Sequence, residues 1–434
     1  MFKVTFQFES GEPVIAYAAE GENLLEVARK TNVAIDAPCS GNASCGKCRV
    51  RLISGELDSK KTRHITDEEY EAGWRLACVS TIAADVTVEV PDIASAYRSR
   101  MKVADLSSTD EIAIFEQAKQ GIESAGIVMK NNMGIVHLTM DPPTLDDTMP
   151  DNERFTWAME AETGLPKVRI PYSVLCKLPD VLREGNFTVT CIVRRTSRDV
   201  FVYDVFPGDE EPVIGGLAVD IGTTTVSAIL INMLNGEIIA KASAGNGQIR
   251  YGADVINRII ESQKPGGKRL LQKAVIEETI NPMIAHMCRT SGFDSSRIYR
   301  MSVASNTTMN HLLMGINADP LRMEPYIPAF FKTNSLYASD IGIQIHPDAH
   351  IIVAPNIGSY VGGDITAGTL VSLLWNKPEF SLFIDLGTNG ELVFGNNEFM
   401  MSCACSAGPA FEGGDISCGM RATDGAIEAC TIDR

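Results

Sequence analysis

Three cysteines in one glycine-rich loop and a fourth far along the chain constrain the fold more than any other feature. Cys39, Cys45 and Cys48 have the spacing C-x5-C-x2-C, and Cys78 follows in a separate segment. Four thiolates that converge from one short loop and one distant anchor form the ligand set of an iron–sulfur cluster. The alternative is a structural zinc site, but such sites usually combine two C-x2-C pairs, and this set has one. The spacing therefore predicts a [2Fe–2S] cluster held by these four residues.

Composition and charge narrow the class of protein further. The 434 residues carry a formal net charge of −17, which argues against a nucleic-acid-binding surface, because such a surface needs a basic face. No apolar run reaches the roughly 18 residues of a membrane span, and the first residues lack the apolar core of a signal peptide. The 11 cysteines, an odd number, fit reduced thiols and metal ligands better than a disulfide framework. We therefore expect a cytoplasmic protein without a nucleic-acid or membrane partner.

The patterning divides the chain into four parts. Residues 1–94 combine strand-like alternation with the cysteine loop, and residues 95–127 are typical of a linker with one helix. Residues 128–207 alternate strand-like and helix-like runs, which predicts a small α/β middle domain without a chemical motif. Residues 213–434 predict a larger α/β region.

Two segments of this last part repeat one pattern. Each has a run of apolar strand residues, then Asp, then a turn rich in glycine and in hydroxyl or amide residues: LAVDIGTTT and LFIDLGTNG. This pattern predicts a hairpin whose turn presents backbone N–H groups to an anion, and an Asp at the strand end can hold Mg²⁺ through water. An ordinary hairpin that binds no anion is the alternative. Two copies weaken that alternative and indicate a duplicated α/β half. The candidate nucleotide-binding residues are Asp220, Gly222, Thr223, Thr224, Thr225, Asp385, Gly387, Thr388, Asn389 and Gly390.

Further side chains are candidates for the same region. A helix-like run at 362–368 contains three glycines that would let it pack closely. One role for Asp364 in this run is to position Mg²⁺ or a water molecule, and the alternative role is to cap the helix. Asp254 is a second candidate catalytic carboxylate, with a solvated carboxylate at a helix start as its alternative. Asn306 follows a short apolar strand and is expected to line the candidate nucleotide site as well. Four late cysteines could form a second metal site, and the alternative is that they are small buried thiols. They are Cys403, Cys405, Cys418 and Cys430.

These motifs resemble those of known families. The x5 interval of the cysteine loop is similar to that of vertebrate-type and bacterial assembly-type ferredoxins, which implies their α+β, β-grasp fold for residues 1–94. In that fold Cys39 and Cys45 share one iron, and Cys48 and Cys78 share the other. The two turns resemble phosphate motifs 1 and 2 of the superfamily that unites sugar kinases, heat-shock ATPases and actin. That resemblance implies two ribonuclease-H-like halves with ATP and Mg²⁺ in the cleft between them.

The order of these parts resembles that of the reductive activators of corrinoid proteins, and the resemblance covers essentially the whole chain. It implies an iron–sulfur electron-transfer protein that uses ATP to return a Co(II) corrinoid to Co(I) in the methyltransferase systems of anaerobes. It also implies three partners, which are a corrinoid protein, an upstream low-potential electron donor and a second copy of the chain in a homodimer.

The end of the chain departs from this family pattern. Arg434 stands 44 residues after Gly390, and neither an adenosine-binding glycine motif nor a second connecting motif precedes it. The sequence therefore resembles the N-terminal portion of a longer protein or a truncated product, with the second ATPase half incomplete and ATP hydrolysis left open. A simple [2Fe–2S] electron carrier is the alternative function, although a carrier has no use for phosphate turns. An activator of a radical or dehydratase enzyme is a third hypothesis, against which the separate [2Fe–2S] domain argues.

Overall fold

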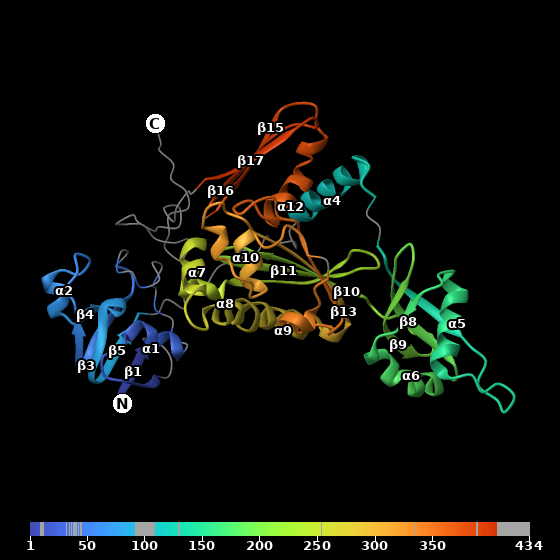
Figure 1. Ribbon diagram of the computed structural model, residues 1–434, viewed down its shortest axis with the longest axis horizontal. Coiled ribbons are helices and arrows are strands. Elements are labelled where there is room, and N and C mark those ends of the chain that lie inside the picture. Colours follow the sequence, from blue (N-terminus) through green and yellow to red (C-terminus); the bar gives the residue numbers. More distant parts are fainter. Residues whose placement is uncertain are drawn as a thin grey trace.

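The computed structural model describes residues 1–8, 13–31, 33, 35, 37, 41, 43, 46–91, 109–128, 131–252, 254–333, 335–387 and 389–405. These residues form four β-sheets, and each sheet is built from one continuous stretch of the chain. The first and second sheets lie on opposite sides of the third (Figure 1). Within the described ranges no helix has the length and apolar character needed to cross a bilayer.

The first sheet has the α+β arrangement predicted around the cysteine loop. Its order is β2-β1-β5-β3-β4, with β1 parallel to β5 and the other neighbours antiparallel. Helix α1 begins after Asn23, whose side-chain oxygen accepts the N–H groups of Leu25 and Glu26 and so caps the helix. The elements are β1 (Phe2–Phe8), β2 (Val14–Ala18), α1 (Leu24–Lys30), β3 (Arg49–Ser59), α2 (Asp67–Glu71), β4 (Trp74–Leu76), η1 (Ala77–Val79) and β5 (Ser80–Val90).

The helix predicted between the first two sheets is α4 (Thr109–Ser124). It packs on α12 (Gly363–Ser372), which belongs to the last part of the chain (Figure 1). A Cβ atom added at Gly121 would lie 2.8 Å from the Cδ1 atom of Leu373, so the two helices are in close contact. Helix α4 is therefore held against the last part of the chain, although the second sheet follows it in sequence.

The second sheet, of order β6-β8-β9-β7, packs against two helices. Phe155 and Leu178 of these helices are fully buried against the strands. The hydroxyl of Tyr299 donates to Asp204 at 2.9 Å and ties this sheet to the third. The elements are β6 (Met133–Thr139), α5 (Asp151–Thr163), β7 (Val168–Arg169), α6 (Tyr172–Glu184), β8 (Thr188–Arg195) and β9 (Val200–Pro207).

The third sheet and the helices packed on it form the largest of the apolar cores found in the described residues. Its order is β12-β11-β10-β13-β14, in which β10, β13 and β14 are parallel while β10, β11 and β12 form an antiparallel meander. The elements are β10 (Gly215–Ile221), β11 (Thr225–Asn232), β12 (Ile238–Gly245), η2 (Gly247–Tyr251), α7 (Val255–Ser262), α8 (Gly267–Val275), η3 (Ile276–Ile280), α9 (Asn281–Ser291), η4 (Ser295–Arg297), β13 (Ile298–Ser305), α10 (Thr307–Leu313), η5 (Asp319–Leu321), α11 (Ala338–Ile341) and β14 (His350–Val353).

The fourth sheet is a second antiparallel meander, of order β15-β16-β17. Helix α12 contacts both β13 and β15 and so connects the last two sheets. A Cβ atom at Gly368 would lie 2.4 Å from the Cζ atom of Phe383, so the predicted close packing of this glycine-rich helix is confirmed. The remaining elements are η6 (Leu374–Asn376), β15 (Ser381–Leu386), β16 (Gly390–Gly395) and β17 (Met400–Cys405).

Candidate functional site

Two of the four predicted cluster ligands lie on neighbouring segments of the first sheet. Cys48 directly precedes β3 and is 1% exposed, and Cys78 lies half-buried in η1. The N–H of Ala77 donates to the carbonyl of Cys48 at 2.8 Å, which ties the two ligand segments together. Cys39 and Cys45 lie outside the described residues.

The glycines of the cysteine loop have the backbone conformation that a curled loop requires. Gly41 has a φ of +92° and Gly46 a φ of +66°, both in a region that side chains disfavour. A Cβ atom at Gly41 would lie 3.7 Å from the Cβ atom of Cys78, so the loop passes close to the distant ligand. The side-chain amide of Asn23 donates to the Cys78 carbonyl at 2.9 Å and anchors that ligand to the start of α1. This arrangement fits a [2Fe–2S] cluster bound by soft thiolates of one loop and one anchor.

The first predicted phosphate turn is a tight hairpin turn. It connects β10 to the antiparallel strand β11, and the N–H of Gly222 donates to the carbonyl of Thr225 at 2.8 Å. Asp220 lies just before the turn, at the end of β10. The hairpin predicted from the sequence is therefore confirmed.

Three side chains from distant elements hold this turn, two of them through its backbone carbonyls. The amide of Asn246 donates to the Gly222 carbonyl at 2.9 Å, and the guanidinium of Arg258 donates to the Thr223 carbonyl. The amide of Asn306 donates to the hydroxyl of Thr223 at 3.4 Å, which places Asn306 against the turn as expected. Arg258 is fully buried and also donates to the Gly252 carbonyl at 2.8 Å.

The second predicted phosphate turn is also a tight hairpin turn, but it is one residue shorter than the first. It connects β15 to β16, and the N–H of Gly387 donates to the carbonyl of Asn389 at 2.9 Å. Leu386 pairs with Gly390, which begins β16, whereas Ile221 of the first copy pairs with Val226, and Thr388 lies outside the described residues. The repeat read from the sequence thus corresponds to two antiparallel hairpins whose turns differ in length.

Four carboxylates at or near the two turns interact electrostatically. Desolvation by the surrounding protein atoms is the main cause that raises the pKa of exposed Asp220 and of half-buried Asp364 to about 6, and the pKa of buried Glu391 to about 7. The negative charge of Asp385 raises all three pKa values further, so it lies near each of them. None of the ion pairs found among the described residues includes any of these four groups. The region therefore carries negative charge that a cation would stabilise.

The carboxylates suit Mg²⁺ held through water better than a metal ion bound directly. In the described part of the chain, no three Asp, Glu, His or Cys side chains lie close enough together to hold a metal ion. Mg²⁺ usually keeps several waters and takes one or two carboxylates together with phosphate oxygens. The donor set present here fits that mode of binding.

Glu391 was missed in the sequence, although a signal for it existed. It pairs directly with Asp385 in the register of β15 and β16, one residue beyond the predicted turn. Paired residues of antiparallel strands point to the same face, so two carboxylates at these positions repel each other. The side chain of Asn389 forms a hydrogen bond to Glu391, which partly offsets the rise of its pKa.

The two predicted catalytic carboxylates have different positions. Asp364 lies in the first turn of α12, and Gly362 is the N-cap residue, so the interpretation of Asp364 as an N-cap is wrong. Asp254 is the N-cap of α7 and accepts the backbone N–H of Asn257 at 2.8 Å and its side-chain amide at 2.6 Å. Asp254 therefore has the helix-start role that was its alternative.

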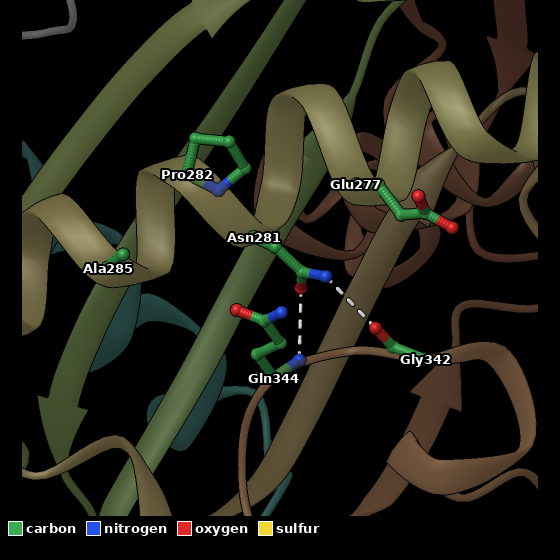
Figure 2. A pocket seen from close by; sticks show the side chains of 6 residues that line it. All are labelled: Glu277, Asn281, Pro282, Ala285, Gly342 and Gln344. Carbon is green, nitrogen blue, oxygen red and sulfur yellow. Dashed lines mark hydrogen bonds between the residues drawn. The ribbon is translucent and has the colours of Figure 1, made fainter.

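A cavity of about 430 Å³ lies elsewhere, between the start of α9 and the loop after α11 (Figure 2). Asn281 donates to the Gly342 carbonyl at 3.0 Å and accepts the Gln344 N–H at 3.0 Å, as Figure 2 shows. The amide of Asn281 is thus satisfied by protein backbone, and it fixes the loop on the helix. None of the four carboxylates lines this cavity.

The late cysteines give no support to a second metal site. Cys403 and Cys405 are exposed on β17, and the thiol of Cys405 donates to the Gly390 carbonyl at 3.2 Å. Cys418 and Cys430 lie outside the described residues. The expectation that the late thiols are buried is wrong for the two that are described.

Family models match almost the whole chain in succession. A model described as a 2Fe-2S iron-sulfur cluster binding domain matches residues 7–83, and the RACo linker region matches residues 122–212. The RACo middle region matches residues 215–377, and the C-terminal domain of RACo, the ASKHA domain, matches residues 379–434. The predicted order of an iron–sulfur domain before an ATPase-type domain is therefore confirmed.

Individual proteins give the same result. The chain is 35% identical over 229 residues to the corrinoid activation enzyme RamQ of Eubacterium limosum. The matched region covers 52% of this chain and 38% of that protein. It is 34% identical to a solved reductive activator for corrinoid,iron-sulfur protein, with a TM-score of 0.61 over 98% of this chain and 66% of the other. It is 26% identical over 160 residues to a component of the Na(+)-translocating NADH-quinone reductase of Yersinia pestis, over 36% of this chain and 39% of that one. The chain thus spans less than two thirds of the length of each of these relatives.

Proposed function

Because the chain belongs to the RACo family of reductive activators for corrinoid proteins, we propose that it passes electrons from a [2Fe–2S] cluster to a corrinoid protein. The cluster would supply one electron that converts Co(II) to Co(I), and MgATP bound by residues 213–434 would drive the transfer. The observation that carries the proposal is the union of two sites in one chain. A ferredoxin fold brings Cys48 and Cys78 together, and two phosphate-type turns carry aspartates that interact electrostatically with each other. A simple electron carrier needs only the first site.

Each part of the chain has its own role in this proposal. Residues 1–94 bind the cluster through Cys39, Cys45, Cys48 and Cys78, and the cluster supplies one electron at a time. Residues 213–434 bind nucleotide, and residues 95–127 and 128–207 connect and position these two parts. The odd number of cysteines supports a reducing, cytoplasmic site of action.

The turn residues bind the nucleotide in this proposal. The backbone N–H groups of the two turns contact the phosphate oxygens. Asp220 and Asp385 would hold Mg²⁺ through water, and Asp364 with Glu391 would orient further waters of the same shell. Bound Mg²⁺ would lower the pKa values of these carboxylates, which desolvation and their mutual repulsion raise.

Nucleotide is needed because the electron transfer is uphill. A one-electron transfer that falls short by 100 mV costs about 2.3 kcal/mol. Binding free energy supplies such an amount when nucleotide favours one of two states of the complex. Helix α12 contacts both β13 and β15, so it is placed to transmit a change in the separation of the two turns.

The test is a calorimetric titration of MgATP and MgADP into the anaerobic full-length chain with its cluster reconstituted. We expect Mg²⁺-dependent binding in the micromolar range, and an Asp220→Asn variant that keeps the cluster spectrum but binds more weakly. A Cys45→Ala variant serves as the reverse control, because it should lose the visible absorbance of the cluster and still bind MgATP.

The second step is a corrinoid assay with a low-potential chemical reductant. Co(I) formation that requires the chain, its cluster and MgATP together supports the proposal. Absence of nucleotide binding in a chain with an intact cluster would instead assign this polypeptide to the class of simple electron carriers.

A further inference from the structure

Arg29 of the cluster-binding domain is buried against the nucleotide-binding part. It lies near the end of α1, and its side chain is 6% exposed. One guanidinium nitrogen lies 2.8 Å from Glu26 of the same helix and 3.9 Å from Glu261 of α7. The other donates to the Arg250 carbonyl at the end of η2, at 3.5 Å. A buried guanidinium is costly unless it is paired, so this contact is specific.

A second cation strengthens the same contact. Lys264 lies 2.7 Å from Glu261 and 3.7 Å from Glu26. The side chain of Glu261 is 4% exposed, so it lies between two cations in a buried position. At this contact each side of the domain boundary supplies one acidic and one basic side chain. Glu26 and Arg29 come from α1, and Glu261 of α7 and the nearby Lys264 come from the other side.

Both elements that Arg29 contacts are bonded to the first phosphate turn. Asn246, immediately before η2, donates through its side chain to the Gly222 carbonyl at 2.9 Å, and its N–H donates to the Thr224 carbonyl at 2.8 Å. Arg258, one turn before Glu261 on α7, donates to the Thr223 carbonyl. Three consecutive carbonyls of the turn are thus held by the two elements that contact the cluster-binding domain.

The opposite end of α1 is bonded to a cluster ligand. Asn23, the N-cap of this helix, donates to the Cys78 carbonyl at 2.9 Å. A single short helix therefore contacts the cluster ligand with one end and the supports of the phosphate turn with the other.

We infer that Arg29 is a positioning residue that couples docking of the cluster-binding domain to nucleotide binding in the first phosphate turn. This inference rests on the nucleotide site of the proposed function and adds the residue that connects this site to the cluster. When Arg29 contacts the Arg250 carbonyl and Glu261, it fixes η2 and α7 in the geometry that holds the turn open to phosphate. Coupling between two sites is reciprocal, so nucleotide in the turn also strengthens docking of the cluster-binding domain.

The test compares Arg29→Gln with two matched Arg→Gln controls in the anaerobic full-length chain. Arg269→Gln removes an exposed ion pair with Glu277 in the nucleotide-binding part, and Arg51→Gln removes one with Glu89 in the cluster-binding domain. Arg29→Gln leaves Glu261 paired with Lys264, so the variant avoids an isolated buried charge. Melting temperature and the visible cluster spectrum confirm that each variant is folded and loaded.

The first readout is amide hydrogen exchange in residues 246–264 without nucleotide, and the second is the Kd for MgATP. We expect Arg29→Gln to increase exchange in this segment and to weaken MgATP binding at least about fivefold, and both controls to match the wild type. Arg29→Lys should fall between the wild type and Arg29→Gln, because an ammonium keeps the charge and cannot span all three partners.

The outcomes separate this inference from the proposed function. Faster exchange together with an unchanged or tighter Kd would overturn the coupling and leave the nucleotide site intact. Unchanged exchange in Arg29→Gln would show that Arg29 does not dock the domain. Absence of MgATP binding in the wild type would overturn the proposed function, and the coupling with it.

Discussion

The two copies of the phosphate hairpin are both antiparallel strand pairs with a tight turn, and their surroundings are very different. Aligned residues of the first strand are buried in one copy, with exposed fractions of 3%, 3% and 0% for Leu217, Val219 and Ile221. The aligned residues of the second copy are exposed, at 54%, 48% and 82% for Leu382, Ile384 and Leu386. A short apolar strand followed by Asp and Gly is thus sufficient for the hairpin, whereas burial depends on what the rest of the chain places on each face.

The neighbours of each strand explain the difference. β10 lies between β11 and β13 in a five-stranded sheet, and its apolar side chains belong to the largest core. β15 is an edge strand of a three-stranded sheet, and within the described residues only its other face is covered, where Phe383 packs on α12. The copies differ chemically as well, because Asp220 pairs with Ser227 while Asp385 pairs with Glu391.

The largest expected effect compares the aligned apolar residues that end the two strands. Ile221→Ala should lower the free energy of unfolding by about 3 kcal/mol, because it leaves a cavity in a closed core. Leu386→Ala should change it by less than about 0.5 kcal/mol, since an exposed side chain leaves no cavity. Chemical denaturation of both variants measures the difference, and equal losses would mean that the second face is covered in solution.

The second prediction compares the aligned aspartates. Asp220→Asn and Asp385→Asn should each weaken Mg²⁺-dependent ATP binding by roughly 10- to 100-fold, because each removes a carboxylate that we propose as a holder of the hydrated ion. Calorimetry at fixed Mg²⁺ measures this effect. If only one substitution weakens binding, the two turns do not share one nucleotide.

The third prediction uses the residue that distinguishes the copies. The pKa of Glu391 is raised to about 7, so between about pH 4 and pH 7 the folded chain binds more protons than the unfolded one. Without Mg²⁺, the free energy of unfolding should therefore decrease as the pH rises through this range. Glu391→Gln should remove on the order of 1 kcal/mol of that decrease, whereas Ser227→Ala, at the matching position of the first copy, should leave it unchanged. Denaturation at pH 5 and pH 8 provides the measurement, and an equal pH slope in the wild type and Glu391→Gln would contradict the raised pKa.

The smallest effect is expected for the third strand of the second copy. Cys403→Ser should leave both the iron content and the stability within about 0.5 kcal/mol of the wild type, because the thiol is exposed. Iron analysis and thermal melting measure these quantities. A loss of iron would make the late cysteines candidate cluster ligands again.

Local signals predicted the parts of the site that depend on local geometry. The turn at Gly222, the turn at Gly387 and the positive φ of Gly41 follow from residues that are adjacent in sequence. Arg258 could not be found in this way, because its acceptor on the phosphate turn, the Thr223 carbonyl, is brought to it only by the tertiary fold. The same holds for Arg29, which has an ordinary helix-end position in sequence and becomes significant only when α1 meets α7.

The packing of α4 on α12 has a consequence for the strength of the contact that Arg29 makes. Because α4 is fixed, the connection from the last strand of the cluster-binding domain to the nucleotide-binding part consists of residues 91–108. Because one chain carries both parts, they meet as an intramolecular pair, and their contact does not depend on the concentration of the protein. A contact too weak to hold two separate proteins together is therefore favoured within one chain.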